Sequence, residues 1–164
     1  MSLQQRPTAP EFLAGASGAG PGGKAPEFRL MHVGVAATAL EPALETLTAL
    51  FGYRVDSGPF DDPIQKVTVL FLTTSSTDLV ELELIAPLTA DSPIRSMLSK
   101  SGGGAYHLCF ETPDLQAAIE HAQRNRCVLV SEPAAATAFG GRPIAWIYTP
   151  TRQLFELVQA ADQS

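Results

Sequence analysis

Two of the three histidines in this chain occupy equivalent positions in apolar segments. His32 lies in the run MHVGV, and His107 lies in YHLCF, 75 residues later. Two glutamates follow at almost the same spacing, Glu83 in ELIAP and Glu156 in ELVQA. Two neutral imidazoles and two carboxylates form a ligand set that suits a divalent metal ion and leaves positions for water or substrate. The four residues therefore predict a metal site.

Glu81 is an alternative to Glu83 as the predicted metal ligand of the first copy. A single histidine in a strand is more often a hydrogen-bonded core residue than a metal ligand, so the prediction depends on the repeated pairing. Glu81 shares a strand face with Glu83, because side chains alternate with a period of two, and a constant spacing of 75 would pair Glu81 with Glu156. We select Glu83 because the E-L-x-x frame after it matches the frame after Glu156. The third histidine, His121, falls on the exposed side of an expected helix and is interpreted as a solvated residue.

The residues around the two histidines belong to an internal repeat. Residues 31–55 and 106–130 align without a gap, and their apolar positions coincide although their identity is weak. Each copy has the pattern of a strand, a helix and a strand, and each continues into two more segments that predict strands. These segments are 66–74 and 78–86 in the first copy, and 143–149 and 153–159 in the second. Such a repeat indicates one supersecondary unit used twice.

The expected helices carry start and stop signals. In the first copy, Thr38 and Glu41 form a T-x-x-E capping box, and Gly52 ends the helix. In the second copy, Thr112 is the expected cap, with Pro113 at the first helical position. Each helix also has one apolar stripe that predicts its packing face. The stripes are Leu40, Ala43, Leu44, Leu47 and Phe51 in the first copy, and Leu115, Ala118, Ile119 and Ala122 in the second.

A short helix is expected between the copies, with Ser92 as its cap and Pro93 at its start. We therefore predict an α+β fold of two βαβββ modules, at about 29–88 and 103–160, linked by a helix at about 93–100. Each sheet buries one face under its helix, and its other face must pack against the partner module. Two curved sheets joined side by side form a half-open barrel with a cleft lined by inward-facing residues.

The folded domain is expected to begin near Arg29. Residues 1–28 are dominated by Gly, Ala and Pro and have little periodicity. Such a segment cannot bury enough apolar surface to offset its ordering entropy. We interpret it as a flexible tail, with residues 29–164 forming a single domain.

The composition indicates a globular protein and argues against several kinds of partner and location. Hydrophobic residues make up 45% of the chain and charged residues 17%, as is typical of a globular protein. The formal net charge of −6 and the lack of a Lys/Arg run argue against nucleic acid as a partner, since a phosphate backbone needs a basic face. No apolar run approaches the length of a membrane span, and no secretory signal is recognisable. Cys109 and Cys127 lie in apolar runs without metal or redox spacing, so we expect reduced core thiols in a cytoplasmic protein.

Longer runs of the sequence resemble a known family. HVGVA at 32–36, LELIAPLTADSPIRSMLSKSGGGAYHLCFETPD at 82–114 and FELVQ at 155–159 are similar to characteristic runs of the vicinal oxygen chelate superfamily. The most specific part is PL-x-x-DSPI followed by L-x-K-x-G-x-G, which resembles the methylmalonyl-CoA epimerases. The superfamily also includes glyoxalase I, extradiol dioxygenases, and fosfomycin and bleomycin resistance proteins. The resemblance covers about residues 29–160.

The resemblance implies a metal-dependent epimerase of a short branched acyl-CoA thioester. His32, Glu83, His107 and Glu156 fall on the family's four metal positions, in agreement with the choice of Glu83. The ion is Co, Mn, Ni, Zn or Fe, which the ligand set does not distinguish. A divalent ion that binds the thioester oxygen and the free carboxylate of a 2-methylmalonyl group stabilises the enolate formed when the C2 proton leaves. By resemblance, Glu156 is also one of the two proton-transfer groups, which makes it the predicted catalytic residue.

Three departures from the family keep other functions open. Val69 stands near the position of a second acid/base glutamate in some epimerases, and valine cannot transfer protons. Tyr106 replaces the first histidine of the family's H-H pair, and the turn within 149–159 is shorter, with Thr149 in place of a histidine. One alternative is a glyoxalase-like lyase or isomerase, or a dioxygenase, that acts on another small substrate. The other is a non-catalytic binding or resistance protein, against which the four intact ligands argue.

Further residues are candidates for contact with a small-molecule substrate, by resemblance an acyl-CoA. These candidates are Tyr106 and Lys100, together with Trp146 and Tyr148, which alternate in one strand. For Trp146 and Tyr148, core packing and cleft lining are both compatible with the pattern. Lys100 suits contact with CoA phosphates, as do Lys66, Arg95, Arg142 and Arg152, although ordinary surface charge is the alternative for each. The exposed sheet edges and the resemblance predict a homodimer.

Overall fold

The computed structural model describes residues 24–75 and 77–161, so most of the expected tail lies outside the described residues. The first strand begins at the predicted domain start. Module one consists of β1 (Arg29–Ala36), α1 (Leu40–Phe51), β2 (Arg54–Asp62), β3 (Val67–Thr73) and β4 (Glu81–Pro87). The linker helix is α2 (Arg95–Ser101). Module two consists of β5 (Gly104–Thr112), α3 (Leu115–Arg124), β6 (Val128–Leu129), β7 (Ala134–Ala135), the 3₁₀ helix η2 (Thr137–Phe139), β8 (Pro143–Tyr148) and β9 (Leu154–Gln159).

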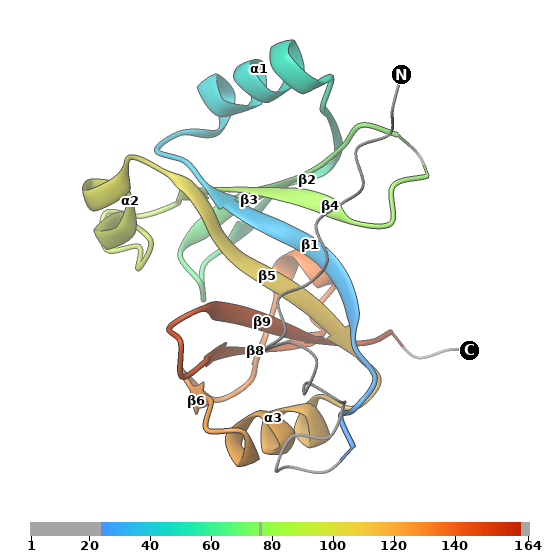
Figure 1. Ribbon diagram of the computed structural model, residues 1–164. Coiled ribbons are helices and arrows are strands. Elements are labelled where there is room, and N and C mark those ends of the chain that lie inside the picture. The colour runs from blue at the N-terminus through green and yellow to red at the C-terminus, as the bar shows by residue number, and fades with distance from the viewer. Residues whose placement is uncertain (1–23, 76, 162–164) are drawn as a thin grey trace, which may run out of the picture.

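The strands form one open, nine-stranded sheet in the order β2-β3-β4-β1-β5-β9-β8-β6, with β7 paired to β8. The modules meet where β1 and β5 run antiparallel, side by side through the centre of Figure 1. In module one the first and last strands, β1 and β4, pair in parallel, and β5 and β9 do the same in module two. The predicted α+β fold of two related modules is confirmed, with its two sheets continuous across the β1–β5 pair.

The helices α1 and α3 lie at opposite ends of the molecule, each beside its own module (Figure 1). The predicted stripe of α3 is buried, as its four residues are all less than a tenth exposed. The stripe of α1 is only half-buried, against Leu70, Leu72 and Leu84 of the sheet. Phe51 does not join that cluster and is 64% exposed, so its predicted burial was wrong. It is the last residue of α1, directly before the left-handed Gly52 (φ 73°) that ends the helix as predicted.

The predicted N-caps were wrong for all three helices. The observed N-cap residues are Ala39, Ile94 and Asp114, in place of the predicted Thr38, Ser92 and Thr112. Of these three, Asp114 caps its helix with a side chain, since its Oδ1 accepts a hydrogen bond from the Ala117 N–H at 2.9 Å. Thr112 instead remains in the sheet, where its carbonyl accepts a hydrogen bond from the Ala160 N–H.

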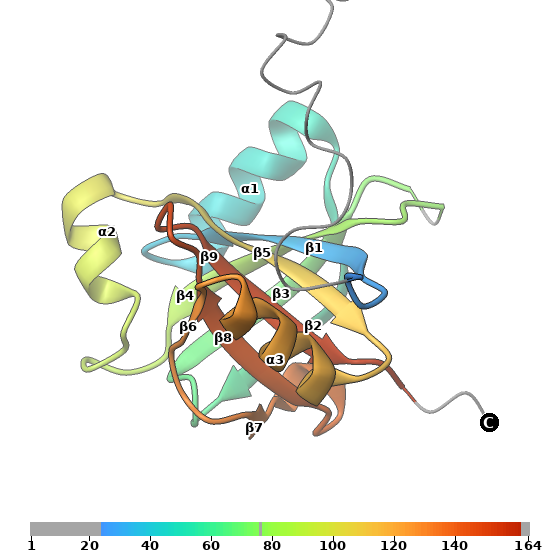
Figure 2. The same ribbon diagram turned by 60° about the horizontal axis from the view of Figure 1, so that its bottom comes forward.

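The modules differ most between the helix and the last two strands. In module one, β2 has nine residues and pairs with β3 from end to end. Its counterpart in module two is divided into β6 and β7, of two residues each, and η2. Both short strands pair with β8, and Figure 2 shows β6 beside β8 and β7 at the bottom of the view. The last two predicted strands are confirmed to within one residue, whereas the one predicted at 78–86 begins only at Glu81.

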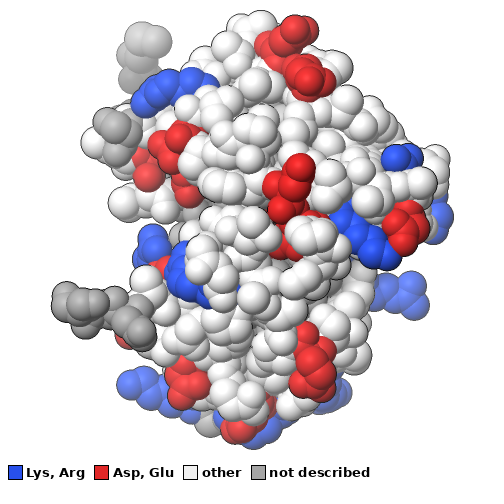
Figure 3. Space-filling model, turned by 180° about the vertical axis from the view of Figure 1, so that it is seen from behind, with Lys and Arg blue, Asp and Glu red and all other residues white. Residues whose placement is uncertain are grey.

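Charged side chains lie in small, separate groups on the face seen in Figure 3. Several charged side chains form ion pairs. Arg142 Nη1 lies 2.8 Å from Glu111 Oε1, Arg29 Nη2 lies 2.6 Å from Glu111 Oε2, and Lys66 pairs with Asp91. Within residues 24–75 and 77–161, none of the helices combines the length and the apolar character that crossing a bilayer requires.

Candidate functional site

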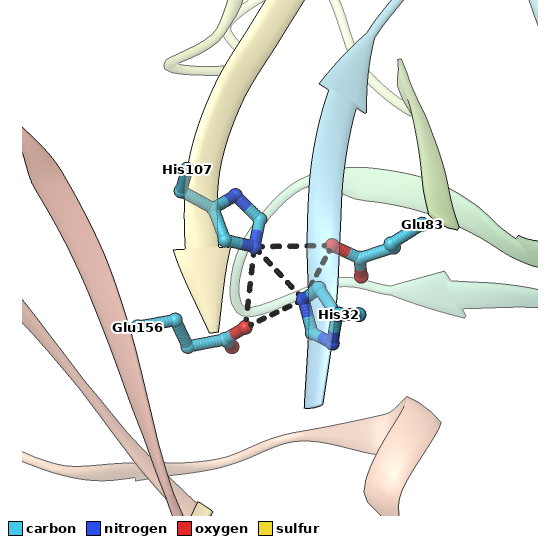
Figure 4. Close-up of side chains that lie close together, drawn as sticks. All are labelled: His32, Glu83, His107 and Glu156. Atoms are coloured by element: carbon cyan, nitrogen blue, oxygen red, sulfur yellow. Dashed lines mark hydrogen bonds and ion pairs between the residues drawn. The ribbon is translucent and has the colours of Figure 1, made fainter. Parts of the chain in front are cut away.

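Four side chains from four strands converge in the centre of the sheet (Figure 4). They are His32 of β1, Glu83 of β4, His107 of β5 and Glu156 of β9, and one ligand-type atom from each lies within 4.8 Å of the others. The structure thus brings together the quartet predicted from the repeat. Glu81 pairs with His32 in the strand register but is not a member of this cluster.

The distances within the cluster are short and nearly symmetric. The Nε2 atoms of His32 and His107 are 2.9 Å apart. Glu83 Oε2 lies 3.2 Å from His32 Nε2 and 3.3 Å from His107 Nε2. Glu156 Oε2 lies 3.2 Å and 3.4 Å from the same two atoms. Each carboxylate therefore contacts both imidazoles, one of which comes from its own module and one from the other.

Strand pairing explains this symmetry. Two rows of paired residues cross the sheet at the site, and each contains one predicted ligand from each module. The first row is Glu83, Gly34 and His107, and the second is Glu156, Cys109 and His32. Gly34 and Cys109 hold the middle positions and are 75 residues apart, which is the spacing of the two histidines. The internal repeat therefore relates one row to the other.

Gly34 leaves the space that the His107 ring occupies. A Cβ atom at position 34 would lie 2.2 Å from His107 Cε1 and 2.4 Å from His107 Nδ1, well inside van der Waals contact. A side chain at position 34 would therefore require the ring to move. The position matters for the site because the displaced ring carries one of the four converging atoms.

The cluster is almost completely enclosed. The exposed fractions are 0% for His32, 6% for Glu83, 5% for His107 and 3% for Glu156. The His32 ring stacks on Phe139, with centroids 5.9 Å apart and planes at 21°. The Nδ1 atoms of both histidines are buried and have no hydrogen-bond partner among the described residues. The His32 ring is therefore held by polar contacts at Nε2 and by aromatic packing on its face, with no hydrogen bond at Nδ1 among the described residues.

The protonation states of the four groups depend on one another. Burial lowers the pKa of His32, but the adjacent carboxylates of Glu156 and Glu83 reverse this effect and raise the pKa to about 9. The same carboxylates raise the pKa of His107 against the effect of burial. Burial raises the pKa of Glu83 and of Glu156, but hydrogen bonding to the imidazoles holds each pKa below the usual range of glutamate. The buried carboxylates are thus ionised and attract positive charge.

This arrangement fits a divalent cation. The imidazole nitrogens and carboxylate oxygens direct their lone pairs into one small, enclosed volume, where positive charge compensates the buried carboxylates. A divalent ion and protons compete for the same atoms, so binding of an ion releases protons. The mixed nitrogen and oxygen set is compatible with Co, Mn, Ni, Zn or Fe. The cluster could therefore hold a metal ion.

A cavity of about 260 Å³ adjoins the cluster and is lined by residues of both modules. Glu83, His107 and Glu156 form a polar part of its wall. Much of the remaining wall is apolar and includes Val67, Val69, Ile85, Ile94, Phe139 and Ile144. None of the described residues that line the cavity is a lysine or an arginine. The cavity thus suits a small, mainly apolar group that reaches the carboxylates.

Three of the four predicted substrate-binding residues, Tyr106, Trp146 and Tyr148, line this cavity. Trp146 packs edge-on against His107, with ring centroids 4.8 Å apart, and its ring centroid lies 6.3 Å from that of Tyr106. Tyr148 is 45% exposed, so it lies where the cavity meets solvent. Lys100 is exposed on α2 and does not belong to the cavity wall, and its contact with a substrate stays a prediction.

Three other residues considered in the sequence analysis are Val69, His121 and Arg95. Val69 is buried in the cavity wall, so the departure from the family lies inside the candidate site. His121 is half-buried, and its Nε2 lies 3.3 Å from Asn125 Nδ2. Its interpretation as a solvated residue was therefore wrong. Among the basic candidates, Arg95 Nε donates a hydrogen bond to the Thr89 carbonyl.

Two further residues of the cavity wall, Asp62 and Phe139, were not predicted from the sequence. Asp62 ends β2 and is 4% exposed, and Phe139 ends η2 against His32. The runs DDP and FGG predict turns at these positions. Turn signals alone do not show that two turns distant in the sequence meet at one site.

The chain belongs to the Glyoxalase/Bleomycin resistance protein/Dioxygenase superfamily, whose family model matches residues 31–146. This match includes both copies of the strand-helix-strand repeat and the linker helix. It confirms the resemblance drawn from the HVGVA run and from the segment at 82–114.

Particular members of the superfamily are similar over most of the chain. An ethylmalonyl-CoA/methylmalonyl-CoA epimerase of Cereibacter sphaeroides is 31% identical over 121 residues, which cover 73% of this chain and 87% of that protein. The crystal structure of methylmalonyl-CoA epimerase from Mycobacterium tuberculosis is 28% identical, with a TM-score of 0.72, and the match covers 82% of this chain and 89% of that one. A structure of methylmalonyl-CoA epimerase with methylmalonyl-CoA and NH4+ is 26% identical, with a TM-score of 0.69, over 81% of this chain and 94% of that one. These relatives are epimerases, which are isomerases.

Proposed function

We propose that this chain is a metal-dependent epimerase of a short, 2-branched acyl-CoA thioester, with methylmalonyl-CoA as the first substrate to test. The observation that carries the proposal is the enclosed cluster of His32, Glu83, His107 and Glu156 beside a largely apolar cavity. Such a cavity suits a small acyl group whose reactive carbon must lie next to a base. The similarity to named epimerases supports the same class of reaction.

In this proposal the Nε2 atoms of the two histidines and the carboxylates of the two glutamates hold one divalent ion. When bound, the ion supplies Lewis-acid stabilisation of the negative charge that develops on the thioester oxygen. The protein keeps the ligand atoms converged and shields them from water. Phe139 and Trp146 contribute to this shielding, because their rings pack against His32 and His107.

Glu156 is the proposed base that removes the C2 proton. Its side chain is 3% exposed and forms part of the cavity wall. Burial raises its pKa, but the hydrogen bonds from His107 and His32 hold the pKa below the usual range of glutamate. The carboxylate is therefore ionised at neutral pH and can accept a proton from a substrate carbon placed in the cavity.

Some epimerases have a second acid/base glutamate, and Val69 stands near its position in this chain. Valine has no exchangeable proton, so another group must return the proton to C2. Tyr106 and Tyr148, whose side chains carry hydroxyl groups, line the same cavity. Burial, together with the nearby Tyr148, Glu156 and Glu83, raises the pKa of Tyr106 to about 12, so its hydroxyl stays protonated and can donate. We assign Tyr106 as a donor to the substrate and as the first residue to test for proton return.

The cavity of about 260 Å³ suits the acyl end of the substrate. The rest of a CoA molecule would extend outside, because the described part of the wall offers no basic side chain for its phosphates. Trp146 and Tyr148 are proposed to pack along the acyl and thioester groups, and Lys100 is proposed to contact the anionic end. A homodimer and a cytoplasmic location remain predictions. Sedimentation or size-exclusion measurements test whether the protein is a dimer.

The test is deuterium exchange at C2 of methylmalonyl-CoA in D₂O, followed by mass spectrometry. The protein is stripped with a chelator, loaded with Co(II), and compared with its stripped form and a blank without enzyme. Glu156→Gln removes the proposed base, and Glu81→Gln is the matched control, because Glu81 is a nearby glutamate outside the cluster. Metal-dependent exchange that is lost in Glu156→Gln and kept in Glu81→Gln supports the proposal. Bound metal without exchange above the blank contradicts it.

A second candidate is a glyoxalase-like lyase or isomerase, or a dioxygenase, that acts on a smaller substrate. Val69 in the cavity wall and the lack of Lys and Arg among its described lining residues favour this alternative. It predicts that Co(II) binds with the loss of protons but that methylmalonyl-CoA is inert. In that case the same exchange assay, run with α-hydroxy thioesters and 2-oxoaldehyde–thiol adducts, identifies the reactive carbon.

A further inference from the structure

Phe139 of η2 joins the inner cores of the two modules at the candidate metal centre. It packs against the module-one cluster that contains Val69 and Phe71 and against the module-two cluster that contains Cys109 and Ile144. Its ring lies 5.7 Å from that of Phe71 and stacks on His32. It also lines the cavity. One side chain therefore both orients a predicted ligand and forms part of the substrate wall.

Asp62 contacts η2 from the other module. It is the last residue of β2 and is 4% exposed. Its Oδ2 accepts a hydrogen bond from the Thr137 N–H at 3.2 Å, and its Oδ1 accepts hydrogen bonds from the N–H groups of Ile64 and Gln65 at 2.9 Å and 2.8 Å. Backbone N–H groups thus satisfy this buried carboxylate. The same side chain ties the β2–β3 turn to η2.

The remaining polar contacts of the η2 region stay within module two. The Arg142 guanidinium lies 5.4 Å from the centre of the Phe139 ring, and its Nε donates a hydrogen bond to the Phe139 carbonyl at 3.3 Å. Its Nη1 donates to Glu111 and to the Gln159 carbonyl. Of the hydrogen bonds made by the described residues of η2, the one to Asp62 crosses to module one.

We propose that Asp62 is a positioning residue for the metal centre, because its hydrogen bond to the Thr137 N–H holds Phe139 against His32 and closes the cavity wall between the modules. The proposal rests on the proposed function in that it treats His32 as a metal ligand. Asp62 does not touch the reacting atoms in this account. It acts through Phe139, whose ring packs on the face of the His32 imidazole, while His32 Nδ1 has no hydrogen-bond partner among the described residues.

The variant Asp62→Asn separates the two roles of this side chain. Its amide oxygen can still accept the hydrogen bonds from Ile64 and Gln65, which outnumber the one from Thr137. Its NH₂ group then faces the Thr137 N–H, so that two donors meet and the contact between the modules is lost. Asp61→Asn is the matched control, because Asp61 is exposed and accepts a hydrogen bond from Thr68 within module one. Phe139→Leu shows the effect of removing the stacked ring directly.

The measurement is NMR of the metal-free protein, which requires neither a bound ion nor a substrate. Amide exchange is followed at Thr137, Ile64 and Gln65, and the ring protons of the histidines are followed in a ¹H–¹³C spectrum. In Asp62→Asn, we expect exchange at Thr137 to become at least about tenfold faster, while exchange at Ile64 and Gln65 changes by less than about threefold. The His32 ring signals should move towards their positions in Phe139→Leu, and those of His107 should move less.

Two outcomes overturn the proposal. If Thr137 exchange and the His32 signals in Asp62→Asn match those of the wild type, the hydrogen bond does not hold η2. If Thr137 exchange accelerates but the His32 signals stay unchanged, Asp62 is structural and does not position the site. In the Co(II)-loaded protein, the positioning role further predicts about a tenfold lower kcat for deuterium exchange in Asp62→Asn than in Asp61→Asn. Failure of the wild type to exchange would contradict the proposed function while leaving the NMR result decisive for Asp62.

Discussion

Module one and module two place their predicted ligands with the same pair of strands. In each, the first strand carries a histidine, the last strand carries a glutamate, and the two strands pair in parallel. The middle of each module is different. β2 of module one is a continuous nine-residue strand, whereas its counterpart in module two is divided and includes η2, which reaches the cluster through Phe139.

The site needs a set of ligand atoms and a cavity wall, and different segments of the modules provide them. The repeated strands supply a nearly symmetric set of ligand atoms, since both carboxylates contact both imidazoles. The divided segment of module two supplies an asymmetric wall, in which Phe139 packs on His32 and the Thr137 N–H donates a hydrogen bond to Asp62 of module one. A nearly symmetric cluster can therefore adjoin an asymmetric cavity, and the proposed roles of the two glutamates can differ although the residues are equivalent in position.

The largest expected effect distinguishes these two glutamates. At saturating Co(II), we expect Glu156→Gln to lower C2 proton exchange of methylmalonyl-CoA by about 10³-fold, because it removes the proposed base, which is also a proposed metal ligand. Glu83→Gln keeps the base and should lower exchange by about tenfold through the weakened metal site. Exchange is measured in D₂O, and metal content is determined for each variant. Equal losses in the two variants would contradict a base that belongs to module two alone.

The next contrast is between α1 and α3, in how much each helix contributes to the free energy of unfolding. Ile119 of α3 is 4% exposed within the core of module two, so Ile119→Ala should lower the free energy of unfolding by about 3 kcal/mol. Leu47 of α1 is only partly buried, so Leu47→Ala should cost about 1 kcal/mol. Urea unfolding of the metal-free protein measures both. If Leu47→Ala cost as much as Ile119→Ala, α1 would be covered in solution by a surface that the isolated chain does not provide.

The middle residues of the two rows give a contrast in metal affinity. Gly34→Val places a branched side chain where the His107 ring lies, and we expect the dissociation constant for Co(II) to rise by about 10- to 100-fold. Cys109→Ala removes only a buried thiol from the equivalent position, and affinity should change by less than about threefold. A competition titration with a chromophoric chelator measures both constants. A similar loss in both variants would mean that the two rows contribute equally to the geometry of the ligands.

Much of the fold and all four members of the cluster were predictable because they depend on a repeated local pattern. The spacing of His32 and His107 and the shared apolar pattern placed the strands, and the E-L-x-x frame selected Glu83 over Glu81, which the structure leaves outside the cluster. The wall was less predictable. Asp62 contacts Thr137 of η2 only because the divided segment of module two crosses to module one, and no periodicity in the sequence encodes such a contact between distant segments.

The helix caps show the same limit on a smaller scale. A threonine at the right spacing can cap a helix, but the chain can also keep that residue in a neighbouring strand, as the hydrogen bond from Ala160 to the Thr112 carbonyl shows. The competing partner in this case is 48 residues away in the sequence. Local signals therefore found where each helix lies but not which residue caps it.

The smallest expected effect tests this limit at the two long helices. Asp114→Ala removes the carboxylate that accepts the Ala117 N–H at the start of α3, and it should lower the free energy of unfolding by about 1 kcal/mol. Thr38→Ala should change it by less than about 0.3 kcal/mol, because α1 begins after Ala39 without a side-chain cap. Both are measured by urea unfolding of the metal-free protein. A loss near 1 kcal/mol for Thr38→Ala would mean that the T-x-x-E capping box does form in solution, and the two modules would then start their helices in the same way.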